Sequence, residues 1–256
     1  MTLSRRVLLA ASLSGAVLCA CSGPQDKRHP AALTARPPAQ PPVGRTSLRP
    51  GLRSIPVRGA RRDTLVYVPE EHEAAQMRLV LSLHGAGGEA ESSVARLQPW
   101  ADEHGLLILA PASQSTTWDV VRSGWGADVQ VIDAALAHVF ETFPVDPVDV
   151  VVSGFSDGAS YALSLGLANG TLLRHVIALS PGFVAQAPRA GEPDIYVTHG
   201  TQDEVLPIDR TSRVIVPRLQ ELGYDVILRE FDGVHAAPPA VIEAAIHWLD
   251  TVSQPR

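Results

Sequence analysis

Short apolar runs and amphipathic segments alternate along residues 64–252. The apolar runs predict strands at residues 64–68, 79–83, 106–109, 148–153, 175–179, 195–198 and 226–231. Apolar residues at helical spacing predict helices at residues 92–104, 129–140, 159–168, 214–222 and 240–252, although Pro217 interrupts one of them and Asp128 is placed to cap another. Several strand candidates are apolar throughout, as in parallel sheets covered by helices on both faces. The pattern therefore predicts one α/β domain with a mostly parallel, doubly wound sheet.

The first 21 residues have the layout of an export signal. Two arginines precede an apolar run at residues 7–18, which is too short to span a bilayer. Residues 18–21 resemble a lipobox, in which Cys21 is lipidated after cleavage, although Cys19 stands where a smaller residue is usual. The arginine pair also resembles a twin-arginine signal. We expect a membrane-anchored lipoprotein of the bacterial cell envelope; cleavage without lipidation, giving a periplasmic or secreted protein, is the alternative.

Residues 22–50 are rich in Pro, Ala, Arg and Gln and contain two proline pairs. Such a composition buries little apolar surface, so we expect a disordered, extended tether. The tether would hold the domain formed by residues 51–256 away from the lipid.

Composition excludes several other classes of protein. The chain has 256 residues and a net charge of −6, and an acidic surface repels the phosphates of nucleic acids. Both cysteines lie within the first 21 residues, so the rest of the chain can form neither an internal disulfide nor a cysteine-based zinc site. The sequence indicates no obligate protein partner.

The segment Gly154-Phe-Ser-Asp-Gly158 carries the clearest chemical signal. Its Gly-x-Ser-x-Gly pattern is weak alone, but an apolar strand precedes it and a helix of small residues follows it. That context is typical of a nucleophilic serine on a strained turn between a strand and a helix. The alternative is a turn that only packs the helix on the strand. We expect Ser156 to be the nucleophile.

A serine nucleophile needs a histidine base and a carboxylate that orients it, and in this strand–turn–helix context both follow the serine along the chain. Asp203 comes just after one predicted strand and His235 just after the next. Glu204 and Asp209 are alternative acids, with Asp209 better placed to cap a helix. We expect His199, in the turn beside Asp203, to have a structural role.

The glycine-rich segment at residues 84–88 follows another predicted strand. Backbone N–H groups in such a turn can point at a developing oxyanion, and we assign the N–H groups of Ala86 and Asp157 to this role. A phosphate-binding loop is the alternative, but the Lys-Ser/Thr continuation of such loops is missing.

Three aromatic residues are candidates for lining a substrate pocket. Trp118 and Trp125 lie in a loop near a strand end of the predicted catalytic edge, and Phe183 follows another predicted strand. Packing of the loop onto the sheet is the alternative role for the two tryptophans.

From about residue 64 to its end, the chain resembles bacterial α/β-hydrolase esterases of the phospholipase/carboxylesterase type and is similar to their polyhydroxybutyrate depolymerase and feruloyl esterase relatives. The residues that carry the resemblance are Leu83-His-Gly85, Gly154-Phe-Ser-Asp-Gly158, His199-Gly-Thr-Gln-Asp203 with Val205 and Pro207, and Gly233-Val-His235 followed by Pro238-Pro239. The resemblance implies an α/β-hydrolase fold, here without a large lid domain.

The function expected from these residues is hydrolysis of small carboxylic esters through an acyl-enzyme, by Ser156, His235 and Asp203 without a metal or cofactor. A serine peptidase or acyltransferase on the same fold is one alternative. A non-catalytic binding protein of the cell envelope is another.

Overall fold

The computed structural model describes residues 29–39, 49–70 and 76–253. Its strands are β1 Gly51–Ser54, β2 Thr64–Val68, β3 Met77–Leu83, β4 Leu106–Pro111, β5 Val145–Phe155, β6 His175–Leu179, β7 Asp194–Gly200 and β8 Val226–Phe231. Its helices are α1 Ala90–Ala101, α2 Asp119–Arg122, α3 Ala127–Thr142, α4 Asp157–Ala168, α5 Ser212–Glu221 and α6 Pro239–Val252, and a short 3-10 helix, η1, covers Ile208–Arg210.

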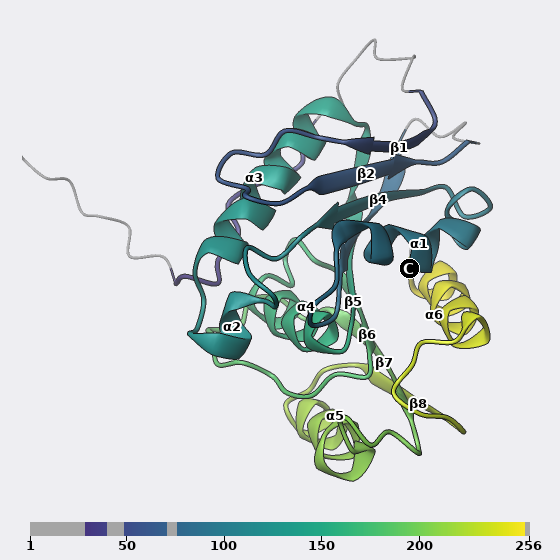
Figure 1. Cartoon of the computed structure of the whole chain (residues 1–256). Coiled ribbons are helices and arrows are strands. Elements are labelled where there is room, and N and C mark those ends of the chain that lie inside the picture. Colours follow the sequence, from purple (N-terminus) through teal and green to yellow (C-terminus); the bar gives the residue numbers. More distant parts are fainter. Residues whose placement is uncertain (1–28, 40–48, 71–75, 254–256) are drawn as a thin grey trace, which may run out of the picture.

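The strands form one sheet in the order β1-β2-β4-β3-β5-β6-β7-β8. Strand β2 is antiparallel to both of its neighbours, β1 and β4, whereas every pairing from β4 to β8 is parallel. Figure 1 shows α1 and α6 on one face of this sheet and α3 and α4 on the other. The predicted doubly wound, mostly parallel sheet is confirmed.

Successive residues of β3 show why this strand is apolar throughout. Leu79, Leu81 and Leu83 pack in the cluster formed with α3 and α4, whereas Val80 packs with α1 and α6. Because side chains alternate between the two faces of a strand, both faces of a doubly covered sheet need apolar residues.

Most predicted elements are present with small shifts at their ends, while β1, α2 and η1 were not predicted. Strand β1 lies at the sheet edge with alternating half-buried and exposed residues, so it lacks a continuous apolar run. The prediction that Asp128 caps a helix is wrong. Helix α3 starts at Ala127, and the Asp128 carboxylate instead accepts the N–H groups of Gln114 and Asp119.

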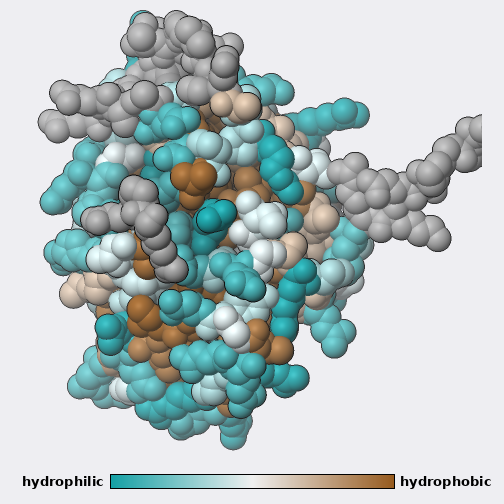
Figure 2. Space-filling view, turned by 180° about the vertical axis from the view of Figure 1, so that it is seen from behind, coloured by the Kyte–Doolittle hydropathy of each residue, from teal (hydrophilic) through white to brown (hydrophobic). Residues whose placement is uncertain are grey.

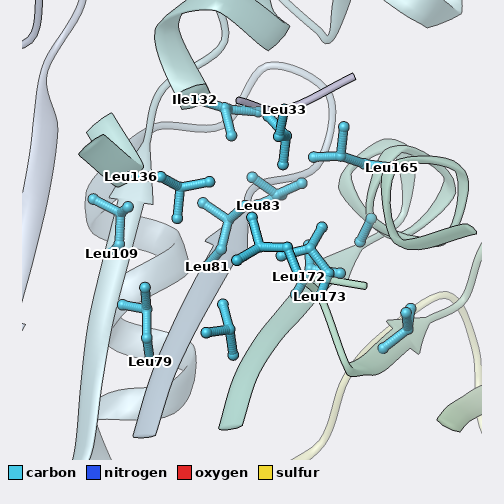
Figure 3. Close-up of a cluster of buried hydrophobic side chains, with 14 of the residues drawn as sticks. Leu33, Leu79, Leu81, Leu83, Leu109, Ile132, Leu136, Leu165, Leu172 and Leu173 are labelled. Atoms are coloured by element: carbon cyan, nitrogen blue, oxygen red, sulfur yellow. The ribbon is translucent and has the colours of Figure 1, made fainter. Parts of the chain in front are cut away.

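Residues 29–39, which we call the strap, differ from the expected disordered tether because they pack on the domain. Leu33 is 3% exposed, and Figure 3 shows its side chain in a buried cluster with Ile132, Leu136 and Leu165. Leu33 packs with residues of α3 and α4 and so helps to fix this proline-rich segment, a contact that the overall composition does not reveal.

Backbone hydrogen bonds of the strap are satisfied by two side chains. Asn169, just after α4, accepts the N–H of Leu33 and donates to the carbonyl of Ala31. Asp133 of α3 accepts the N–H groups of Thr34 and Ala35. The expected signal peptide, Cys21 and the remainder of the tether up to residue 48 lie outside the described residues.

The outer surface is mixed in character. Seen from behind in Figure 2, hydrophobic side chains form separate patches among hydrophilic ones, which is ordinary for a folded domain. Within the described ranges, no helix combines the length and the apolar character needed to cross a membrane.

Candidate active site

Ser156 lies on the turn between β5 and α4, at the carboxyl edge of the sheet. Its φ of 59° and ψ of −120° lie in a region that residues with a side chain rarely adopt. Two glycines make the turn possible. A Cβ on Gly154 would overlap the backbone of Gly158, and one on Gly158 would overlap the carbonyls of Leu83 and His84. The glycine spacing thus reflects close contact between this turn and the end of β3.

The structure brings together three side chains that lie far apart in sequence. His235, in the connection from β8 to α6, has its Nε2 2.9 Å from the Oγ of Ser156. Its Nδ1 lies 2.6 Å from the Oδ2 of Asp203, in the connection after β7. An ionised carboxylate only accepts hydrogen bonds, so the Nδ1–H of His235 donates to Asp203 and Nε2 is free to accept the serine proton.

The carboxylate of Asp203 is buried and has a hydrogen-bond partner at each oxygen. Its Oδ1 accepts the N–H groups of Val205 and Leu206 at 2.9 and 2.7 Å. Burial alone would raise the pKa of Asp203, but the hydrogen bonds from Leu206 and His235 lower it below its usual value. Asp203 is therefore ionised at neutral pH. The alternative acid Glu204 is exposed at the surface.

His199 contacts the same carboxylate oxygen of Asp203 as His235 does. Its Nε2 lies 3.1 Å from the Oδ2 of Asp203 and 2.8 Å from the carbonyl oxygen of Leu206, and its Nδ1 lies 2.7 Å from the Oγ of Ser212. Burial lowers the pKa of His199, which favours the neutral ring. Because Nε2 faces two acceptors, it carries the proton, and Nδ1 accepts the hydroxyl of Ser212. His199 thus fixes the position of Asp203.

Asp209, the second alternative acid, lies in η1 rather than at the start of α5. Its carboxylate pairs with the guanidinium of Arg213 at 2.7 Å. It contributes neither to the group around His235 nor to a helix cap, because the residue that precedes α5 is Thr211.

The loop that carries Ala86 runs beside the nucleophile. A Cβ placed on Gly85 would lie 3.3 Å from the Cβ of Ser156. Among the described residues, the N–H groups of Ala86 and Asp157 have no hydrogen-bond partner. Asp157 is also the first residue of α4, where backbone N–H groups are free of helical partners. Both groups are thus available to an oxyanion at Ser156.

Arg62 and His84 hold this loop in shape. The guanidinium of Arg62 donates to the carbonyls of Gly88, Ser113 and Ser115 at 3.0, 3.1 and 2.8 Å. His84 is buried, and its Nε2 accepts the N–H of Ser113 while its Nδ1 lies 2.7 Å from the carbonyl of Gly85. Burial lowers the pKa of His84, in keeping with a neutral ring protonated at Nδ1.

The three aromatic candidates for a pocket have different positions. Trp118 is fully buried, donates its Nε1–H to the carbonyl of His84 and stacks on Tyr161. Its indole therefore supports the loop that begins at His84 and does not line an accessible pocket. Trp125 is half-buried and packs on Tyr161 at 5.3 Å between ring centroids. Phe183 is half-buried in the connection after β6 and stays a pocket candidate.

Sequence reasoning did not find Arg62 or Thr117, and for His199 it expected only a structural role in the turn beside Asp203. The hydroxyl of Thr117 donates to the Asp157 carboxylate at 2.6 Å. Arg62 and Thr117 reach the site from connections remote in sequence, and no local pattern marks them. For His199, the spacing of four residues to Asp203 was the one available signal.

Comparisons with known proteins find similarity to esterases. The family model described as Phospholipase/Carboxylesterase matches residues 128–253, which include Ser156, Asp203 and His235. An acetylxylan esterase from Coprinopsis cinerea is 29% identical over 138 residues, or 49% of this chain. That match spans 36% of the fungal protein, so the chain corresponds to about a third of this curated relative.

Solved structures, among them an esterase, are similar to this chain over more of its length. The crystal structure of esterase PE8 superimposes with a TM-score of 0.61 and 26% identity, covering 73% of this chain and 97% of that protein. The structure of TT1662 from Thermus thermophilus has a TM-score of 0.60 and 22% identity, covering 82% of this chain and all of that protein, and it supports the fold alone.

Proposed function

We propose that this chain, which has the α/β-hydrolase fold and is similar to esterases, hydrolyses carboxylic esters through a covalent intermediate on Ser156. The observation that carries the proposal is the continuous hydrogen-bonded series from Ser156 through His235 to Asp203, with distances of 2.9 and 2.6 Å. This series lies beside two unpaired backbone N–H groups, as acyl transfer requires.

The reaction follows from these contacts. His235 Nε2 takes the hydroxyl proton as the Oγ of Ser156 attacks the ester carbonyl, and the N–H groups of Ala86 and Asp157 stabilise the resulting oxyanion. Asp203 stabilises the imidazolium that forms. His235 then gives its proton to the departing alcohol, which leaves an acyl group on Ser156. Water attacks that acyl group by the same route, and the carboxylic acid is released.

Labelling with a fluorophosphonate and a panel of nitrophenyl esters test this proposal. The wild-type chain should be labelled and should hydrolyse esters, whereas Ser156→Ala should lose labelling and at least about a thousand-fold in kcat. The matched control is Ser123→Ala, an exposed serine near α2, which should behave like the wild type. Turnover by Ser156→Ala within tenfold of the wild type would refute the role of Ser156.

The same panel separates the alternatives and narrows the substrate. Amide analogues cleaved as fast as the esters would favour a peptidase, and absence of both labelling and turnover would favour a binding protein. The panel varies acyl length and includes acetylated xylan, because the fungal relative is named an acetylxylan esterase. We expect small esters to be preferred to amides.

We also propose that the chain is exported and carries a lipid on Cys21. The sequence pattern of residues 1–21 supports this, and metabolic labelling with a fatty acid tests it. A labelled band in the wild type that is lost in Cys21→Ser would support the anchor, and an unlabelled wild type would exclude it.

A further inference from the structure

A cation, an aromatic ring and the imidazole of His235 form a row beside the nucleophile. The guanidinium carbon of Arg96, on α1, lies 5.2 Å from the centroid of the Phe155 ring. Phe155 immediately precedes Ser156, and its ring centroid lies 4.9 Å from that of His235 at an angle of 34°. The charge of Arg96 is thus one ring away from the base.

Arg96, unlike the partly buried Arg62 and Arg78, has no anionic partner among the described residues. Its Nη1 is buried without a hydrogen bond, and no ion pair of the described residues involves its guanidinium. Arg78, by contrast, is held by the carboxylates of Asp149 and Asp250 at 2.6 and 2.7 Å. Burial lowers the pKa of Arg96 to about 10, so the group is still charged at neutral pH.

A partly buried charge without a partner is unfavourable for the folded state. Groups of this kind cluster at functional sites, where a ligand or a reacting group can use the charge. Arg96 is half-buried, so part of its side chain reaches the solvent although Nη1 does not.

The side of the site on which Arg96 lies indicates the part of the substrate involved. His235 gives its proton to the departing alcohol, so the alcohol portion of the ester must lie next to the imidazole. Phe155 adjoins the same imidazole and is half-exposed, so part of its ring is open to an apolar group of the substrate.

We propose that Phe155 and Arg96 form a subsite for an alcohol portion that carries an anionic group, with its apolar part on the ring and its anion on the guanidinium. The inference rests on the proposed esterase activity and names the class of ester that this site favours.

Two acetyl esters that differ mainly in charge provide the test: 4-acetoxybenzoate, with a carboxylate on the alcohol portion, and its neutral methyl ester. Values of kcat/KM are measured for the wild type, Arg96→Met and Arg96→Lys. The control Arg218→Met makes the same change of net charge on α5, away from Ser156. Wild type should prefer the anionic ester by tenfold or more, and added salt should reduce this preference.

Arg96→Met should lose tenfold or more in kcat/KM on the anionic ester while its value on the neutral ester changes less than twofold. Arg96→Lys should retain part of the preference, and Arg218→Met all of it. Because Met replaces an unpaired cation with an apolar side chain of similar length, its unfolding free energy should not fall.

The inference is overturned if the wild type hydrolyses both esters equally well, or if Arg96→Met slows both alike and unfolds more easily, as expected of a residue that only packs α1. Failure of the esterase proposal gives a different result, since neither ester would then be hydrolysed and Ser156 would not be labelled by a fluorophosphonate.

Discussion

Replacing Asn169 with alanine should destabilise the domain by releasing the strap. The Asn169 side chain makes three hydrogen bonds, with the N–H of Leu33 at 2.8 Å and with the carbonyls of Ala31 and Leu165 at 2.9 Å each. Ala31 and Leu33 are 1% and 3% exposed, so water does not easily replace the lost partner. A buried group left unpaired costs about 1–3 kcal/mol, and two such groups in the strap give a loss of about 3 kcal/mol.

Urea unfolding of four chains measures this loss. They are the full chain, Asn169→Ala, a chain starting at residue 40, and the combination of both changes. Without the strap, Asn169→Ala removes only the bond to Leu165, so the substitution should then cost about 1 kcal/mol. Asp133→Ala, which loses the more exposed strap bonds to Thr34 and Ala35, should cost less than Asn169→Ala in the full chain.

The reasoning would be refuted if Asn169→Ala lowered the unfolding free energy by the same amount, within about 0.5 kcal/mol, in the full chain and in the chain that starts at residue 40. The strap would then contribute nothing to stability through Asn169. A short chain as stable as the full chain would show that residues 29–39 are not part of the folded domain. The catalytic edge lies at the other end of α4, so the short chain should still hydrolyse esters.

Three further predictions concern the site and its support. The unfolding free energy should fall as the pH drops below about 6.5, because burial lowers the pKa values of His84, His175 and His199 in the folded state and the unfolded chain therefore binds protons first. Urea unfolding between pH 8 and 5 that gave the same unfolding free energy throughout would contradict this. Gly158→Ala should abolish ester hydrolysis and lower the unfolding free energy by about 1–3 kcal/mol, since its Cβ would overlap the end of β3; a variant with normal activity would show that the turn adapts. Arg62→Gln should reduce kcat on nitrophenyl acetate about tenfold by loosening the loop of Ala86, with a smaller change in KM; an unchanged kcat would mean that the loop holds its shape without Arg62.

The continuous apolar strands were predicted most accurately from the sequence. The predicted ranges of β2, β6 and β8 agree with the structure. Every residue of β2 and β6 is buried, and such strands leave a nearly continuous run of apolar letters. Helix α5 also forms despite Pro217. This proline and Arg213, whose carbonyl loses its helical donor, are both exposed, so water can bond that carbonyl.

Where the sequence failed, a distant contact decides the role of the residue. Trp118 was a pocket candidate, but it is buried because its indole N–H finds the carbonyl of His84, 34 residues away. Asp128 accepts N–H groups of a loop instead of capping α3. Residue order nevertheless predicted which side chains meet at Ser156, since the strand ends of a parallel sheet share one edge.

The strap also determines how the protein can be attached to a solid support. The strap meets the domain at Asn169, and helix α4, about 18 Å long for its 12 residues, separates that point from Ser156. A resin, tag or electrode coupled ahead of residue 29 is therefore joined to the domain at the edge opposite the nucleophile. Immobilisation through the N-terminus should leave the catalytic edge facing the solution.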